Sequence, residues 1–361
     1  MRRLIESLLV AACVIVAWGL LNFSLISCGK YTEQIVRYQV FPEEIHLKAE
    51  SVPLDTAVLF RYPYRVKVRE GLAIVMDLHH TDHYFHAFTY PEWKHLVSFG
   101  KRGEGPEDML LAETFQFNSL DSLWTLDPNK RQITRWRLSP EACSAERVEE
   151  IALDEQLVRT LDFYMTDTGF IVPSYLGIYR YHLLNFQGKI LRSEGHIPTE
   201  NTSPDISRPA LAQAWRSFMD YHPQNDLLVM VTQLGEVLEF MHLGDSTHTV
   251  LYGPHGEPEF RAVQNEAIPT GIRGFSDVQL TDNYMYAVFH GRTFKEIQAA
   301  YQKGEKPEGG GRFIYVFDLA GNPVRKYILD RSICGIDVDE LTHTITATDV
   351  NSNEPLIQFK M

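Results

Sequence analysis

Short strand-like segments recur at a regular interval along most of the chain. From about residue 57 onward, runs rich in Val, Ile, Tyr, Phe, Trp and Leu alternate with turns rich in Asp, Asn, Gly and Pro, a pattern typical of strands and turns. The first turn of each repeated unit falls roughly fifty residues after the previous one, at Glu70-Gly71, Asp121-Ser122, Asp167-Thr168, Asn225-Asp226, Asp282-Asn283 and Asp339-Glu340. A single unit would expose both faces of its sheet, and radial stacking buries them. The pattern therefore predicts an all-β, six-bladed β-propeller over residues 52–361, with a large two-sheet sandwich as the alternative.

The end of the chain, Pro355–Met361, has the composition of a final strand. Because an unpaired last strand would leave an open sheet edge, we expect it to share a blade with an N-terminal strand near Ala57–Phe60. Such pairing would close the ring without a covalent bond.

An insertion interrupts the fifth unit. Residues 293–296 have the spacing of a capping box, and Phe294, Ile297 and Tyr301 would share one face of a helix that ends at Gly304. A glycine-rich loop follows. We interpret the insertion as a packed surface element, with a partner-docking element as the alternative.

The N-terminus has the pattern of an export signal. After Met1-Arg2-Arg3, the 21 residues from Ser7 to Ser27 carry no charge, which suits a membrane span or a secretory signal. Residues 25–28, Leu-Ile-Ser-Cys, resemble the lipobox of bacterial lipoprotein precursors. The resemblance implies a signal peptide at 1–27, a lipid on Cys28 that attaches the protein to a membrane of the bacterial cell envelope, and a lipidated tether and lead-in at 28–51. An uncleaved anchor is the alternative, and the sequence leaves open whether the protein faces the periplasm or the cell surface.

The charge of the chain argues against some classes of binding partner. The chain has 34 basic and 47 acidic side chains, a net charge of −13, which argues against nucleic-acid binding and against a polybasic membrane patch. Loss of residues 1–27 would remove a net charge of +1 and leave a net charge of −14 on 334 residues.

Cleavage of the signal peptide would remove Cys13, and Cys28 would be acylated. Cys143 and Cys334 would then remain, and they lie in repeats that are not neighbours. Two separate thiols are therefore favoured over one disulfide.

Three segments resemble the TolB-like family of six-bladed propeller lipoproteins. They are the glycine loop Gly100–Asp108 (GKRGEGPED), residues 280–293 (LTDNYMYAVFHGRT) and residues 314–323 (IYVFDLAGNP). The resemblance implies the propeller fold and a location in the cell envelope, and it implies no catalytic residue. His290 departs from the small residue expected before Gly-Arg-Thr. A weaker copy of the glycine loop at 252–260 favours an architectural role for this motif over phosphate binding.

A charged set recurs about eight to ten residues before each first turn, where the innermost strand of a blade should begin. Five of the six positions hold arginine and one holds glutamate. The six residues are Arg61, Glu113, Arg159, Arg216, Arg273 and Arg331. In a propeller these strand starts surround one mouth of the central channel. Because a guanidinium matches carboxylate or phosphate, the set predicts a mouth that binds a small anionic ligand, with Glu113 setting orientation. The alternative is that each arginine pairs with an acid such as Asp162, Asp220 or Asp277 and links the blades.

A histidine cluster occupies residues 79–86 (HHTDHYFH). Imidazoles suit zinc or copper, but strand alternation puts His79 and His80 on opposite faces, and likewise His83 and His86. We therefore expect a solvated turn and no metal site.

The sequence lacks a nucleophile elbow, a zinc-protease motif and a Walker loop. We interpret the protein as a lipid-anchored envelope propeller, without a cofactor, that acts as a scaffold for a small anionic ligand or an envelope protein. The alternative is a propeller-fold hydrolase or lyase acting on an anionic envelope or extracellular substrate.

Overall fold

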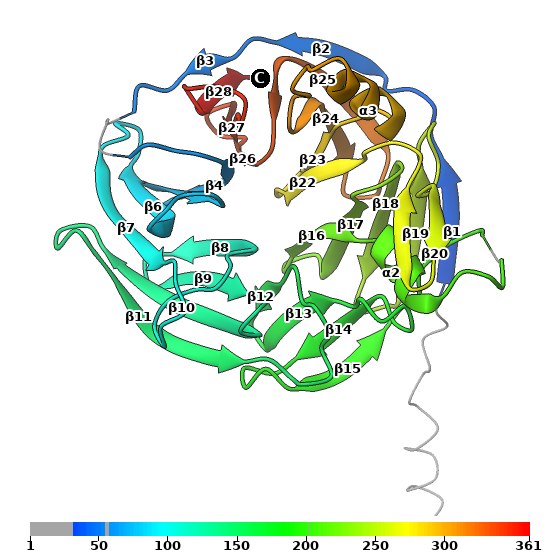
Figure 1. The fold of residues 1–361 in the computed structure, drawn as a ribbon, viewed down its shortest axis with the longest axis horizontal. Coiled ribbons are helices and arrows are strands. Elements are labelled where there is room, and N and C mark those ends of the chain that lie inside the picture. The colour runs from blue at the N-terminus through cyan, green and yellow to red at the C-terminus, as the bar shows by residue number, and fades with distance from the viewer. Residues whose placement is uncertain (1–31, 55–57, 202) are drawn as a thin grey trace, which may run out of the picture.

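The computed structural model describes residues 32–54, 58–201 and 203–361, so the expected signal peptide and Cys28 lie outside the described residues. Figure 1 shows six sheets arranged radially around a central axis, which confirms the predicted all-β six-bladed propeller. Within the described ranges, no helix is both long and apolar enough to cross a membrane. Cys143 and Cys334 are free thiols.

The first three blades each hold four antiparallel strands, which run outward from the axis in chain order. The first blade comprises β4 (Pro63–Arg69), β5 (Leu72–Asp77), β6 (His83–Thr89) and β7 (His95–Lys101). The second comprises β8 (Thr114–Ser119), β9 (Ser122–Asp127), β10 (Gln132–Ser139) and β11 (Ser144–Ala152). The third comprises β12 (Tyr164–Thr166), β13 (Gly169–Pro173), β14 (Tyr181–Leu184) and β15 (Ile190–Glu194).

The last three blades also incorporate the N-terminal segment. The fourth comprises β16 (Ser217–His222), β17 (Leu227–Thr232), β18 (Val237–His242) and β19 (Thr247–Tyr252). The fifth comprises β22 (Phe275–Leu280), β23 (Tyr284–Phe289), β24 (Gly311–Asp318) and β25 (Pro323–Ile333). The sixth has β26 (Ile336–Asp339), β27 (Thr344–Thr348) and β28 (Leu356–Lys360). All six expected first turns fall at the junction between the innermost strand of a blade and the strand that follows, although Ser122 already begins β9 and Asp339 still belongs to β26.

The N-terminal strands run along the outer rim of the propeller (Figure 1). β1 (Thr32–Arg37) pairs in parallel with β19, and β2 (Glu43–Leu47) pairs in parallel with β25. Much of the segment expected to be a tether and lead-in is therefore built into the fourth and fifth blades. Local sequence does not reveal this, because the strands find their partners more than 200 residues away.

The ring closes in the sixth blade, but not through the expected strand. β3 (Glu50–Ser51) pairs antiparallel with β28, and the Val52 N–H donates to the Leu356 carbonyl at 3.0 Å. The expectation of a strand near Ala57–Phe60 was wrong, since the described residues 58–60 form none. They instead provide Val58 and Phe60 as packing for an apolar cluster beside the closing blade.

The core lies between neighbouring sheets. One buried cluster joins Val229 and Phe240 of the fourth blade to Phe275 and Met285 of the fifth. Comparable clusters join the fifth blade to the sixth and the first blade to the second. Each sheet therefore buries its faces against the next, as radial stacking requires.

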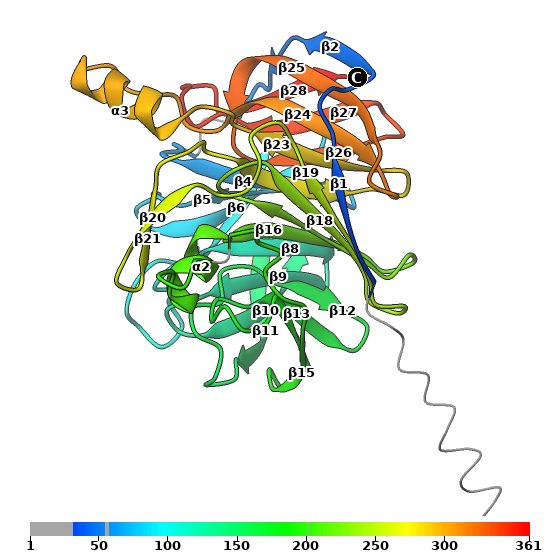
Figure 2. The same cartoon turned by 90° about the vertical axis from the view of Figure 1, so that its right-hand side faces the viewer.

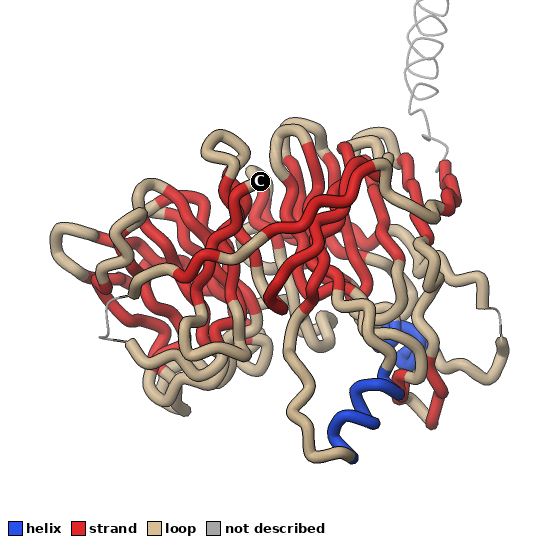
Figure 3. Tube along the Cα trace, turned by 90° about the horizontal axis from the view of Figure 1, so that it is seen from above, coloured by secondary structure: helices blue, strands red, loops and turns tan. Residues whose placement is uncertain are grey.

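The two faces of the disc differ in the length of their connections. We call the face at which the innermost strands begin the mouth face, and the other the opposite face. Long connections on the mouth face carry α2 (Arg208–Ala214), the hairpin β20 (Phe260–Val263) with β21 (Glu266–Pro269), and α3 (Phe294–Gln302). Figures 2 and 3 show these elements together on one side. β1 begins at the opposite face, because Thr32 pairs with Thr247 at the start of β19.

The predicted insertion helix is confirmed as α3. The Glu296 N–H donates to Thr293 Oγ1 at 3.1 Å, and the Thr293 N–H donates to Glu296 Oε2 at 2.8 Å, which forms the expected capping box. Gly304 follows with a φ of +77°, a left-handed conformation that suits a helix end. None of the helix residues is buried, and α3 projects from the body of the propeller (Figure 2).

The glycine loop is held by a lysine from the second blade. Lys130 Nζ donates to the carbonyl of Gly105 at 3.1 Å, to that of Pro106 at 3.2 Å, and to that of Asp108. A Cβ on Gly103 would lie 2.4 Å from Asp108 Oδ2, so a larger residue there would displace this carboxylate. These contacts support an architectural role for the motif.

Candidate functional site

Three of the six sequence-predicted positions line one cavity on the mouth face. Arg159 lies in the connection that leads to β12, Arg216 directly precedes β16, and Arg273 lies two residues before β22. The arginines belong to the third, fourth and fifth blades, and they share a cavity of about 470 Å³. We call this the mouth cavity.

The structure places the other three positions elsewhere. Glu113 directly precedes β8 and pairs with Arg216 but does not line the cavity. Arg61 has an exposed side chain, and its backbone N–H donates to Asp77 Oδ2 at 2.7 Å. Arg331 lies within β25 and not at the start of an innermost strand, because β25 continues to Ile333. The structure therefore brings three of the six positions into one cavity lining and holds Glu113 against one of them.

The rest of the cavity lining is apolar or neutral. Its residues are Tyr64, Val158, Leu161, Tyr175, Pro209, Gln213, Phe218, Gln233, Leu234, Asn265, Ala267, Pro269, Phe275, Ser276 and Phe294. Among the described residues that line the cavity there is no Asp, Glu or His. The mouth cavity is thus a cationic site on a chain whose net charge is −13.

Acidic partners neutralise only some of the predicted arginines. Arg216 pairs with Glu113, which links the fourth blade to the second across the mouth. Arg331 Nη1 lies 3.9 Å from Asp349 Oδ2. Within residues 32–54, 58–201 and 203–361, Arg159 and Arg273 have no ion-pair partner. Two of the three guanidinium groups at the cavity are therefore uncompensated.

Buried polar atoms of the lining also lack partners. Tyr175 Oη, Gln233 Nε2 and Arg216 Nε are shielded from solvent and have no hydrogen-bond partner among the described residues. Burial raises the pKa of the Tyr175 hydroxyl above its ordinary value, so this group stays protonated and able to donate. Buried polar groups in native proteins are normally satisfied, so these three donors are open to a water molecule or to another acceptor.

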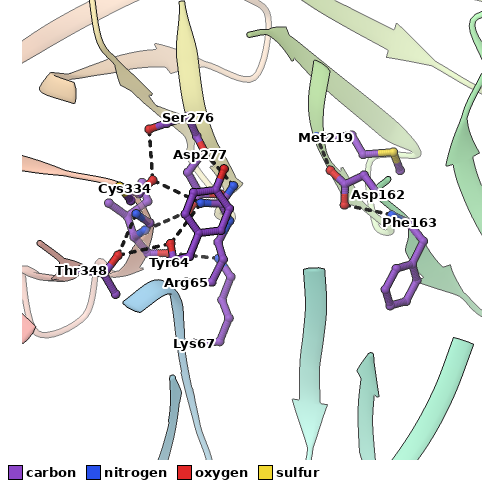
Figure 4. A network of polar contacts seen from close by, with 12 residues as sticks. Tyr64, Arg65, Lys67, Asp162, Phe163, Met219, Ser276, Asp277, Cys334 and Thr348 are labelled. Atoms are coloured by element: carbon purple, nitrogen blue, oxygen red, sulfur yellow. Dashed lines mark hydrogen bonds and ion pairs between the residues drawn. The ribbon is translucent and has the colours of Figure 1, made fainter. Parts of the chain in front are cut away.

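The carboxylates considered as arginine partners have another role. Asp162, Asp220 and Asp277 each accept a backbone N–H from the innermost strand of the next blade: Met219 at 3.0 Å, Leu280 at 2.7 Å and Ile336 at 2.8 Å. Figure 4 shows the Asp162 contacts. Burial raises the pKa of Asp162 to about 7 and that of Asp220 to about 6. These carboxylates link the blades without the predicted arginine set.

Sequence reasoning missed Arg65, which is buried on the innermost strand of the first blade. Its guanidinium donates to the carbonyls of Ser276 at 2.7 Å and Cys334 at 3.3 Å (Figure 4). The available signal was the alternation of Arg65, Lys67 and Arg69 along β4, which places three cations on one face of a strand. Their partners lie on strands more than 200 residues away, so no local pattern revealed them.

The histidine cluster is divided between a turn and a strand. His79 is exposed in the turn between β5 and β6, whereas His86 is buried on β6. His86 Nδ1 lies 2.8 Å from Ser98 Oγ, and burial lowers the pKa of His86 to about 3. Among the described residues, no group of three or more His, Cys, Asp or Glu side chains could hold a metal ion.

Comparisons with known proteins place the fold in a family. A family model for TolB-like 6-blade propeller-like proteins matches residues 40–341, which is most of the chain. The chain belongs to this TolB-like propeller family. No curated protein matches it.

Solved structures share the fold of this TolB-like propeller at low sequence identity. A Bacteroides fragilis protein described as exported has a TM-score of 0.56 and 9% identity, and the match covers 90% of this chain and 99% of that one. A member of the DUF4221 family from Bacteroides vulgatus has a TM-score of 0.53 and 9% identity, covering 87% and 96%. Inactive virginiamycin B lyase of Staphylococcus aureus, solved with quinupristin, has a TM-score of 0.51 and 11% identity, covering 87% and 99%. At these identities the likeness concerns the fold alone.

Proposed function

We propose that this TolB-like propeller is a lipid-anchored protein of the bacterial envelope that binds an anionic ligand in the mouth cavity. One observation carries the proposal: arginines from three blades line a single cavity, and none of the described residues lining it is acidic. Guanidinium groups held together repel one another, and a carboxylate or phosphate removes that cost while accepting paired hydrogen bonds.

The lining favours binding over hydrolysis. A general base for hydrolysis is usually a histidine or a carboxylate within hydrogen-bond reach of the substrate. The described lining offers guanidinium, amide and hydroxyl groups instead. These groups are suited to hold an anion and to orient it.

The start of β1 and the mouth cavity lie at opposite faces. Cys28 precedes Thr32 by four residues, which span at most about 14 Å when fully extended. Since β1 begins at the opposite face, a lipid on Cys28 would bring that face toward the membrane and leave the mouth face toward solvent. The lipobox and the exported Bacteroides protein of the same fold support an envelope location.

Substitution of Arg159 and Arg273 by glutamine tests the proposal. Both variants should melt within a few degrees of the parent protein, because neither guanidinium has an ion-pair partner among the described residues. Citrate binding measured by titration calorimetry should weaken at least about tenfold for each variant, the loss expected for one charge-assisted hydrogen bond. Arg261→Gln is the matched control, since Arg261 is an exposed arginine on the same face that does not line the cavity. Unfolding of both variants would favour a blade-linking role, and unchanged citrate binding would contradict the proposal.

A further inference from the structure

We propose that the ligand of the mouth cavity is an amphiphilic organic anion, with one carboxylate-type head and an apolar body. This inference rests on the proposed anion-binding function and adds the chemical class of the ligand. It follows from the way in which donors and apolar side chains are distributed over the lining.

The head would lie on the side of the arginines and of the donors that lack a partner. Tyr175 comes from the connection between β13 and β14, Gln233 from the turn between β17 and β18, and Arg216 from the start of β16. Each contributes one buried polar atom without a partner among the described residues. A carboxylate offers about four lone-pair directions on two oxygens, so one head group can accept from more than one donor.

Part of the apolar wall comes from elements that do not belong to any blade. α2 contributes Pro209, β21 contributes Ala267 and Pro269, and Phe294 begins α3. These accessory elements rise together on the mouth face (Figure 3). The accessory elements therefore add apolar surface to a cavity whose arginines come from the connections that lead to β12, β16 and β22.

The connection that carries Arg159 extends the apolar surface. Val158 and Leu161 flank this arginine in the lining, and Val158 is 56% exposed. An inorganic anion would satisfy the donors and leave this surface in water. A cavity of about 470 Å³ is within the usual size range for small organic ligands.

The affinities of a homologous series of carboxylates separate the contribution of the head group from that of the apolar body. Acetate, butanoate and hexanoate are titrated at pH 7.5 into the full chain in lipid nanodiscs, with empty nanodiscs as the blank. Each CH₂ that leaves water can tighten Kd by up to roughly fourfold. Hexanoate should therefore bind at least about tenfold more tightly than acetate, and also more tightly than hexan-1-ol. In a parallel arm, 3-phenylpropanoate distinguishes an aromatic body from an aliphatic chain.

Two variants assign the halves of the site. Phe294→Ser should reduce the gain from acetate to hexanoate, with little change in acetate affinity. Tyr301→Ser, on the same helix and outside the lining, is its matched control and should leave the gain intact. Tyr175→Phe should weaken all carboxylates by a similar factor, because it removes a donor to the head.

The outcomes separate this inference from the proposed function. Equal affinity for acetate, hexanoate and phosphate would contradict the inference that the ligand is amphiphilic, and it would leave the proposed anion binding intact. A hexanoate gain that Phe294→Ser does not change would place the apolar body elsewhere and overturn the assignment. Failure of citrate, phosphate and every carboxylate to bind would contradict the proposed function as well.

Discussion

Arg65 on the innermost strand of the first blade forms a buried ion pair with Asp277 on the innermost strand of the fifth blade, with Arg65 Nε 3.3 Å from Asp277 Oδ1. The same guanidinium also donates to the carbonyl of Cys334, which precedes the sixth blade. One side chain therefore connects the blades on both sides of the closing blade. A six-membered ring built from distant parts of the sequence gains a central constraint from this contact.

Replacement of Arg65 by alanine should destabilise the propeller strongly. The substitution leaves the Asp277 carboxylate buried without its charge partner, which typically costs about 3–5 kcal/mol of unfolding free energy. Arg137→Ala breaks an exposed pair with Asp121 and should cost less than about 1 kcal/mol. Urea unfolding of the two variants measures the difference, and equal losses would show that the Arg65 pair has no special role.

Deletion of residues 356–361 should lower the melting temperature sharply. The deletion removes β28 and with it the pairing to β3, the contact that joins the two ends of the ring. It also removes the buried side chains of Leu356, Ile357 and Phe359. Leu341→Ser, at a residue that is 94% exposed, is the control and should melt like the parent. An unchanged melting temperature after the deletion would argue against closure through β28.

The carboxyl group of Asp162 should make stability fall as pH rises. Its pKa is raised to about 7 by burial, so the folded state holds the proton more tightly than the unfolded chain. Stability from this group is fully present below its unfolded pKa of about 4 and is lost as pH rises toward 7. Between pH 4 and pH 8, the stability of Asp162→Asn relative to the parent should therefore improve by a few kcal/mol. A constant difference across this range would contradict the raised pKa.

Lys130→Met should loosen the glycine loop while leaving the blades intact. The ammonium group binds three carbonyls of residues 105–108, and methionine retains the chain length without any donor. Amide hydrogen exchange over residues 103–109 should accelerate severalfold, with little change in melting temperature. Lys101→Met removes only an ion pair to Asp108 from a side chain that is 67% exposed, and it should have a smaller effect. Equal exchange in both variants would argue against Lys130 as the clamp of this loop.

Local signals explain which parts of the fold could be predicted from the sequence. The six first turns and the capping box of α3 depend on residues close together in the chain, so their patterns are readable. β3 has only two residues, and its partner β28 lies about 300 residues later. β1 and β2 are largely exposed and do not show the alternation of a half-buried strand. Such segments form strands because they pair with the exposed edge strand of a blade.

The candidate site was predictable to the extent that blades repeat evenly. Arg216 and Arg273 lie just before their innermost strands, so a fixed offset from the first turn found them. The offset failed at Arg331, because a long outer strand continues almost to the sixth blade. Tyr175 and Gln233 come from connections between outer strands, where the sequence has no repeated signal. Their place in the cavity lining follows only from the folded structure.

A crystal structure of this protein grown with 3-phenylpropanoate would show whether the mouth cavity binds an amphiphilic anion. We expect electron density for the carboxylate in the mouth cavity, within hydrogen-bond distance of Arg216 and Tyr175, with the phenyl ring toward Phe294. An empty cavity at saturating ligand, with Arg159 and Arg273 each folded onto an acidic side chain of the protein, would contradict the account.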